Sequence, residues 1–169
     1  EEKGIRSLLE GWRGLPWTLH VVGQGSLSSE LMQTYGNDLQ IRFHGQLPRE
    51  RVRDVIRQST LAVFPSTWHE PFGLGVIEAM ASGRPVVTAG PGAPGTLIEH
   101  GISGIHLPQP SPNALAKACE QLLCDPQRVR QMGDEARRRY LDCYSPDAHL
   151  QTLNNVFEEL IHRGEGMCA

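Results

Sequence analysis

A strand–helix–strand pattern between residues 60 and 89 constrains the fold more than any other feature of the sequence. The segment "TLAVFPS" (60–66) is continuously apolar, as strands are when both faces of their sheet are covered. It is followed by the helical pattern "GLGVIEAMAS" (73–82) and by a second apolar segment, "RPVVTA" (84–89). Gly83 lies between them, where a glycine commonly ends a helix. Two strands joined by a helix predict a parallel sheet.

The same alternation runs through most of the chain. Strands are expected at 17–23, at 39–45 and near Ile105. Helices are expected at 3–14, 27–35 and 47–59, with a short one at 96–100. Two or three more helices are expected over 112–163, the last of them at 145–163. This order predicts the α/β class, with a Rossmann-like doubly wound parallel sheet in a single domain over residues 1–169.

No strand precedes the first predicted helix. In the usual order of a Rossmann-like sheet the opening strand is central, so its absence is expected to leave a gap. We therefore expect that the upstream part of a longer protein is missing from this chain. Ligands of such sheets bind at the carboxyl ends of the strands, which directs attention to the loops at 23–26, 44–48, 65–73 and 89–96.

Composition excludes several classes of protein. The net charge of -3 and the pI near 6.2 argue against a nucleic-acid binder. No apolar run approaches the length of a membrane span. The four cysteines (Cys119, Cys124, Cys143 and Cys168) have no CxxC spacing and are expected to be reduced structural thiols. The histidines form no HExxH motif and there is no Asp-x-Asp, so no metal site is predicted.

Glu78 is the most informative single residue, because it sits in an almost entirely apolar helical segment. A carboxylate in such a place needs a partner. Glu70 precedes the same helix in the loop that also carries Ser66, and Gly73 and Gly75 expose the first backbone amides of the helix to an anion.

Two carboxylates on either side of a phosphate-binding turn fit a ligand with hydroxyls, then phosphate, then hydroxyls again. A nucleoside-diphosphate sugar has that order, and the partner of Glu78 is then expected to be a ribose rather than a residue of this chain. The alternatives are that Glu70 is a surface or capping residue and that Glu78 is a salt-bridged core residue.

Three further features carry weaker signals. Lys3 is a candidate phosphate partner or an ordinary exposed lysine. Gly23 and Gly25 form part of a dinucleotide fingerprint, but Ser28 replaces its third glycine, which disfavours NAD and leaves a tight turn as an equal alternative. The loop "GPGAPGT" (90–96) is a candidate second phosphate or sugar loop, or Thr96 simply caps the following helix. Solitary histidines near the loops, His44 and His69, are expected to be structural.

Taken together, these motifs resemble the C-terminal, donor-binding domain of retaining GT-B glycosyltransferases of family 4, the glycosyl transferases group 1. The resemblance rests on "VVGQGS", "FHGQLP", "LAVFPSTWHEPFGLGVIEAMASGRPVV", "IEHGISGIHL" and "YSPDAHLQTLNNVFEEL", and so covers nearly the whole chain. The spacing from Glu70 to Glu78 around "PFGL" is its most specific part. "GAPGT" departs from the family's glycine loop, since Thr96 stands where a glutamate is usual.

The resemblance implies roles for individual residues. Glu70 is the implied catalytic residue and contacts hydroxyls of the transferred sugar, while Glu78 binds the ribose. The amides of Phe72, Gly73 and Leu74 meet the sugar and diphosphate, and Lys3 contacts the diphosphate. With the candidates from the loops, the full set of predicted donor-binding residues is Lys3, Gly23, Gly25, Ser66, Glu70, Phe72, Gly73, Leu74 and Glu78.

The implied activity is sugar transfer from a nucleoside-diphosphate sugar with retention of configuration, without a metal or any other cofactor. The acceptor is a saccharide, a lipid or a small molecule, and the N-terminal acceptor domain is expected to be missing from this chain, so that the chain alone is inactive. The implied location is cytoplasmic, with peripheral association at the cytoplasmic membrane face for the intact enzyme. The alternative is a non-catalytic nucleotide-sugar-binding module completed by a separate acceptor-domain chain; a sugar-nucleotide epimerase fits the paired glutamates less well.

Overall fold

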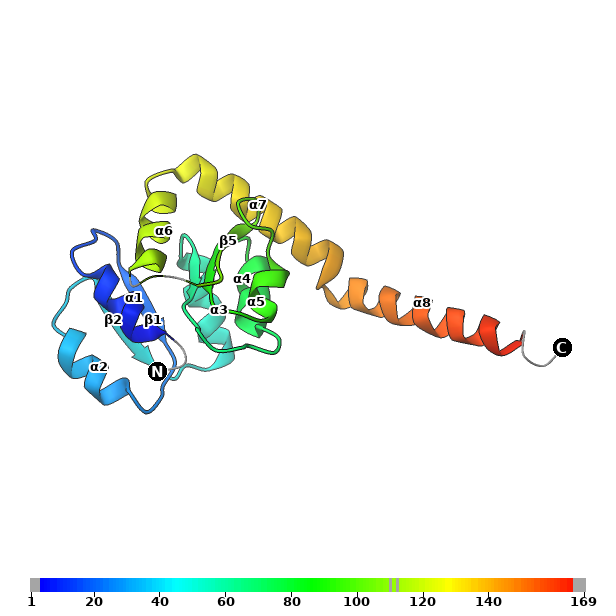
Figure 1. Cartoon of the computed structure of the whole chain (residues 1–169), viewed down its shortest axis with the longest axis horizontal. Coiled ribbons are helices and arrows are strands. Elements are labelled where there is room, and N and C mark those ends of the chain that lie inside the picture. The colour runs from blue at the N-terminus through cyan, green and yellow to red at the C-terminus, as the bar shows by residue number, and fades with distance from the viewer. Residues whose placement is uncertain (1–3, 110, 112, 166–169) are drawn as a thin grey trace.

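The computed structural model describes residues 4–109, 111 and 113–165. Strands and helices alternate through the first two thirds of the chain and helices finish it (Figure 1). In chain order the elements are α1 (Ile5–Trp12), β1 (Leu19–Val22), α2 (Ser28–Tyr35), β2 (Ile41–Gly45), α3 (Arg49–Gln58), β3 (Ala62–Phe64), α4 (Leu74–Ala81), β4 (Val86–Ala89), α5 (Ala93–Leu97), β5 (Gly104–Leu107), α6 (Ala114–Leu123), α7 (Pro126–Cys143) and α8 (Pro146–Glu165).

The described strands form two parallel sheets. β1 pairs with β2, and β3, β4 and β5 form a second sheet with β4 in the middle. Parallel neighbours need a crossover between them, and a helix supplies it in each case. The predicted α/β class with Rossmann-like parallel pairing is therefore confirmed.

Helices cover both faces of the second sheet. Val86 and Val87 are both fully buried in β4 and, as neighbours in a strand, point to opposite faces. Val86 belongs to a core with Val76 and Met80 of α4, whereas Val87 belongs to a core that includes Leu115 of α6. This arrangement explains why "RPVVTA" has no polar face.

The two sheets are not hydrogen-bonded to each other, and a cavity lies between them. A cavity of about 1220 Å³ is lined by both β1 and β3, each of which pairs on one side only within the described part of the chain. The expectation that 60–66 is buried on both faces was wrong for this reason. Ala62, Val63 and Phe64 are each only half-buried, because β3 borders the cavity.

Two local features differ in how well they follow the sequence patterns. α4 ends as predicted: Gly83 has φ of 65°, its N–H donates to the Met80 carbonyl at 2.9 Å, and the N–H of Arg84 donates to that of Ala79 at 3.0 Å. The short helix predicted at 96–100 instead begins earlier, as α5, because a proline in its first turn favours a helix start. Thr96 therefore does not cap it, and its hydroxyl donates to the Ala93 carbonyl within the helix.

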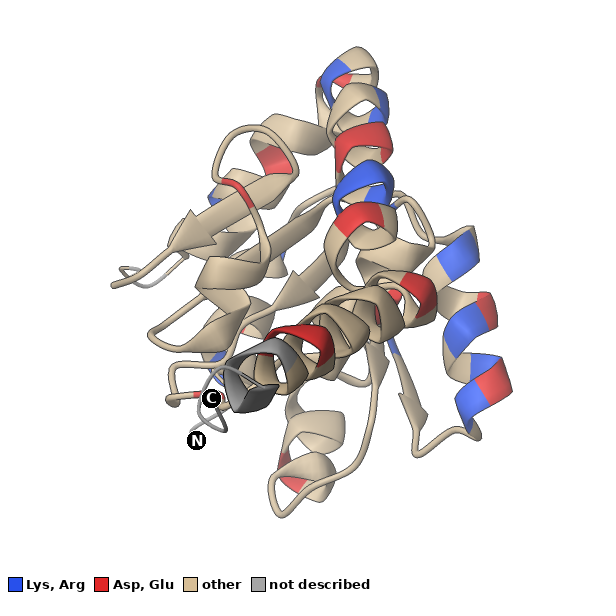
Figure 2. Ribbon diagram, turned by 90° about the vertical axis from the view of Figure 1, so that its right-hand side faces the viewer, with Lys and Arg blue, Asp and Glu red and all other residues tan. Residues whose placement is uncertain are grey.

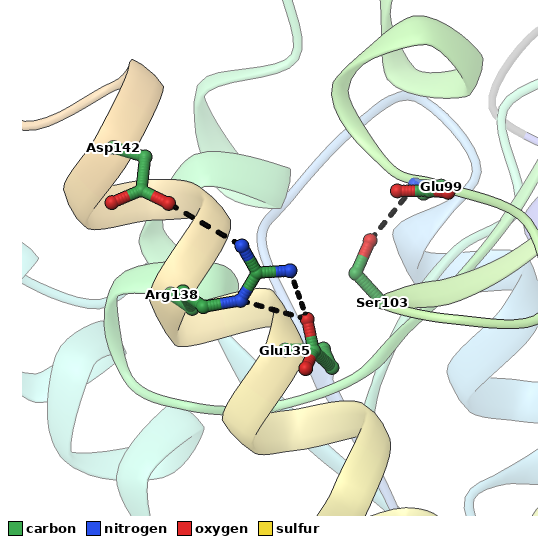
Figure 3. Close-up of polar contacts among 5 residues, drawn as sticks. All are labelled: Glu99, Ser103, Glu135, Arg138 and Asp142. Carbon is green, nitrogen blue, oxygen red and sulfur yellow. Dashed lines mark hydrogen bonds and ion pairs between the residues drawn. The ribbon is translucent and has the colours of Figure 1, made fainter.

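Charged residues of both signs are interspersed on the helices rather than segregated (Figure 2). On α7, Arg138 pairs with Glu135 and lies 3.5 Å from Asp142 (Figure 3). Beside this cluster, the Ser103 hydroxyl accepts from the N–H of Glu99 at 2.8 Å, closing a turn before β5. Such a mixture of signs is typical of a solvated helix face.

The last helix, α8, projects from the rest of the molecule (Figure 1). It spans Pro146–Glu165, close to the helix predicted at 145–163. It exposes a row of apolar side chains: Leu150, Leu153, Val156, Phe157, Leu160 and Ile161. None of the helices in the described ranges combines the length and the apolar character that crossing a membrane requires.

Candidate functional site

Every predicted site residue that the structure describes lines the cavity beside β3. This set is Gly23, Gly25, Ser66, Glu70, Phe72, Gly73, Leu74 and Glu78. They come from the turn after β1, the loop after β3 and the first turns of α4, and so lie at the carboxyl ends of the strands, where α/β ligands bind. Lys3 lies outside the described residues. The roles of these residues in donor binding remain predictions.

Glu70 is fixed in place from two sides. The Ser66 hydroxyl, itself buried, donates to Glu70 Oε1 at 3.1 Å. The Glu70 backbone forms a parallel bridge to Gly92, and its carbonyl accepts from the N–H of Ala93 at 3.0 Å. A carboxylate held this way keeps one orientation, as a group that recognises hydroxyls must.

The glycine loop after β4 supports Glu70 through close backbone contact. A Cβ on Gly92 would lie 2.6 Å from the Glu70 carbonyl oxygen, and one on Gly90 would lie 2.4 Å from that of Ser66. Both glycines also have positive φ angles, which side chains disfavour. The observed contacts of these two glycines are thus with the loop that carries Ser66 and Glu70.

The start of α4 has the features of an anion site. Gly73 adopts φ of 85° as the residue before the helix, and the Val76 N–H donates to the Gly73 carbonyl at 2.9 Å. The amides before Val76 have no place in the helical ladder and carry the positive end of the helix dipole. Gly75 also has a packing role: a Cβ there would lie 2.4 Å from Phe64 Cε1, so its absence lets α4 pack on β3.

Glu78 has a partner within this chain, contrary to expectation. Its Oε1 accepts from Arg49 Nε at 3.3 Å, and its side chain is 26% exposed to solvent. The neighbouring Val76, Ala79 and Met80 fill the core, but the Glu78 side of α4 turns towards α3. The structure thus favours the alternative that Glu78 is salt-bridged, at a half-buried rather than a core position.

The "GQGS" turn (23–26) is closed by Ser28, two residues after it. The Gly25 N–H donates to the Ser28 hydroxyl at 2.8 Å, and the Ser28 N–H donates to the Gly25 carbonyl at 3.0 Å. A Cβ on Gly23 or Gly25 would meet no atom within 4 Å. The turn therefore presents open backbone to the cavity, and Ser28 does structural work in place of the third glycine.

A histidine pair was missed by sequence reasoning, which took His44 as a solitary residue. His20 Nδ1 lies 2.8 Å from His44 Nε2 across β1 and β2, with the rings stacked, and both residues line the cavity. Burial, followed by the charges of His44 and Arg42, lowers the pKa of His20. His20 and His44 lie on two different strands, and the sequence does not reveal the register in which these strands pair. The contact could therefore not be predicted from the sequence. Within the described ranges, no three His, Cys, Asp or Glu residues gather as metal ligands would.

Comparisons with known proteins place the chain in a family. Residues 1–139 match the family described as glycosyl transferases group 1. D-inositol 3-phosphate glycosyltransferase of Corynebacterium kroppenstedtii is 33% identical over 135 residues, which are 80% of this chain and 30% of that protein.

Two solved structures have the same fold. Sucrose-phosphate synthase from Thermosynechococcus elongatus superposes with a TM-score of 0.82 at 28% identity, over 96% of this chain and 43% of that one. HepE of Anabaena in complex with UDP-glucose superposes with a TM-score of 0.81 at 24% identity, over 94% of this chain and 46% of that one. The chain spans less than half the length of each of these relatives. It belongs to the glycosyl transferases group 1 family and has the fold of the C-terminal domain of GT-B glycosyltransferases.

Proposed function

We propose that this chain is the donor-binding half of a glycosyltransferase, which transfers a sugar from a nucleoside-diphosphate sugar to an acceptor. One observation carries the proposal: Glu70 and Glu78 flank the first turn of α4 and open on the same cavity. Two hydroxyl acceptors separated by free backbone amides match the order of sugar, diphosphate and ribose in such a donor.

In this proposal Glu70 is the catalytic residue and binds hydroxyls of the transferred sugar. Ser66 and Gly92 hold it in a fixed orientation, which favours transition-state positioning over flexible binding. The amides of Phe72, Gly73 and Leu74 receive the diphosphate, with Gly23 and Gly25 offering further open backbone across the cavity.

We further propose that transfer proceeds with retention and without a metal. The charge that develops on the leaving diphosphate is then stabilised by the amides of the α4 N-terminus and by cations such as Lys3. The acceptor, whether a saccharide, a lipid or a small molecule, would bind to parts of the longer protein that correspond to the unmatched length of the relatives. The chain alone is therefore expected to bind donor without transferring sugar.

Calorimetric titration of the chain with UDP, GDP and ADP tests the proposal; UDP is the first probe because HepE was solved with UDP-glucose. At least one should bind, and Glu78→Gln should weaken it by roughly 10-fold or more, since hydrogen bonds to charged groups contribute about 1.5–3 kcal/mol. Glu50→Gln on the first turn of α3 removes the same charge at an exposed position and is the matched control. Equal affinity for the Glu78 variant and the unaltered chain would contradict the ribose role.

A further inference from the structure

The proposed donor site contains an electrostatic conflict. Glu70 and Glu78 bring two carboxylates to a turn that is proposed to bind a diphosphate, and like charges within one site repel. Glu70 is partly compensated, because the buried Ser66 hydroxyl donates to it. Glu78 lies deeper along α4, where the dipole of the helix N-terminus is weaker, and needs another source of positive charge.

Arg49 supplies that charge. It is the first residue of α3, and its Nε lies 3.3 Å from Glu78 Oε1 in the second turn of α4. α3 also carries Arg51 and Arg57, but each of these pairs with Asp54 on its own helix, with an N–O distance of 4.0 Å. Among the described residues, Arg49 is thus the arginine whose ion pair reaches a predicted donor-binding side chain.

The geometry of the pair leaves Glu78, which lines the cavity, able to act on a ligand. Only one N–H of the guanidinium and one oxygen of the carboxylate are used in the recorded contact, whereas an arginine has five N–H donors and a carboxylate has about four acceptor sites. The Arg49 side chain is 71% exposed and that of Glu78 is 26% exposed. Within the described part of the chain the contact of Glu78 uses Oε1, which leaves Oε2 to accept from a ribose hydroxyl.

We propose that Arg49 is a positioning residue for the nucleotide donor, an inference that rests on the proposed function. It orients the Glu78 carboxylate through their ion pair, and its charge offsets that of Glu78. The pair can then accept hydrogen bonds from neutral hydroxyls without repelling the neighbouring diphosphate. Arg49 is the cation that allows a carboxylate to serve in a phosphate-binding site.

Nucleotide affinity of Arg49→Met and Arg49→Lys, measured by calorimetry, tests this inference. The affinity for each diphosphate is compared with the affinity for its own nucleoside: UDP with uridine, GDP with guanosine and ADP with adenosine. Arg49→Met should weaken the diphosphate by about 10-fold and the nucleoside by much less, because only the diphosphate is repelled by an uncompensated Glu78. Arg49→Lys keeps the charge and should retain most of the diphosphate affinity. Arg53→Met, an exposed arginine on the same helix, is the matched control.

A double-mutant cycle separates the charge from simple loss of a contact. In the Arg49→Met background, Glu78→Gln removes the repulsive charge and should weaken diphosphate binding much less than it does in the unaltered chain. Additive losses, or an Arg49→Met affinity equal to that of Arg53→Met, would overturn the inference while leaving the proposed function intact. If the unaltered chain binds none of the three diphosphates, the proposed function falls and this inference with it.

Discussion

Replacing Gly92 with alanine is expected to damage both the stability of the domain and the sugar end of the site. Gly92 has φ of 103° and ψ of -168°, a conformation that residues with side chains occupy at a free-energy penalty of about 1–3 kcal/mol. A Cβ there would also lie 2.6 Å from the carbonyl oxygen and 2.9 Å from the nitrogen of Glu70. Neither backbone atom can rotate away, so a further penalty of about 1–3 kcal/mol is expected from the overlap.

Gly23→Ala isolates the overlap. Gly23 has a similar φ of 121°, but a Cβ there would meet no atom within 4 Å. Both alanines reduce the entropy of the unfolded chain by a similar amount, so the difference between the two variants reports the contact with Glu70. Urea unfolding should give Gly92→Ala a free energy of unfolding lower than that of Gly23→Ala by about 1–3 kcal/mol, or roughly 1 M in midpoint.

The same comparison also has a binding readout. Gly92→Ala displaces the backbone of Glu70 and should weaken a nucleoside-diphosphate sugar more than the corresponding nucleoside diphosphate, which lacks the sugar that Glu70 is proposed to bind. Equal stability of the two variants would refute the argument from backbone overlap. A normal ratio of the two affinities would refute the proposed link between the glycine loop and Glu70.

Three other predictions concern the fold. Burial is the main cause that lowers the pKa values of His20 and His106 in the folded chain. Below about pH 6.5 the unfolded chain therefore binds more protons than the folded chain, and the free energy of unfolding should fall as the pH drops. Urea titrations of the variant with both histidines replaced by glutamine should show a flatter decline with pH. Burial raises the pKa of the Cys119 thiol to about 12, so peptide mass spectrometry should find exposed Cys143 alkylated and Cys119 unmodified until urea unfolds the chain. Met80 is fully buried, and Met80→Ala should lower the free energy of unfolding by about 2–5 kcal/mol; a loss below 1 kcal/mol would contradict its place in the core.

The elements themselves could be predicted from the sequence because their signals are local. The apolar run at 84–89 became the buried central strand β4, and Gly83 ended α4 with the predicted left-handed conformation. Patterns failed where a neighbour decided the outcome. The run at 60–66 resembles a strand covered on both faces, yet β3 borders the cavity, and no periodicity within a segment reports what lies beside it.

The sequence by itself determined the α/β alternation, the loops at the strand ends and the pairing of Glu70 with Glu78 around a glycine turn. These features depend on residue type and on spacing of a few positions. Only the tertiary structure decided that Arg49 forms an ion pair with Glu78, that the Gly92 backbone pairs with that of Glu70, and that His20 and His44 lie within hydrogen-bonding distance of each other. Each of these contacts joins residues more than twenty positions apart, and the way the strands and helices pack, rather than any local preference, brings such residues together.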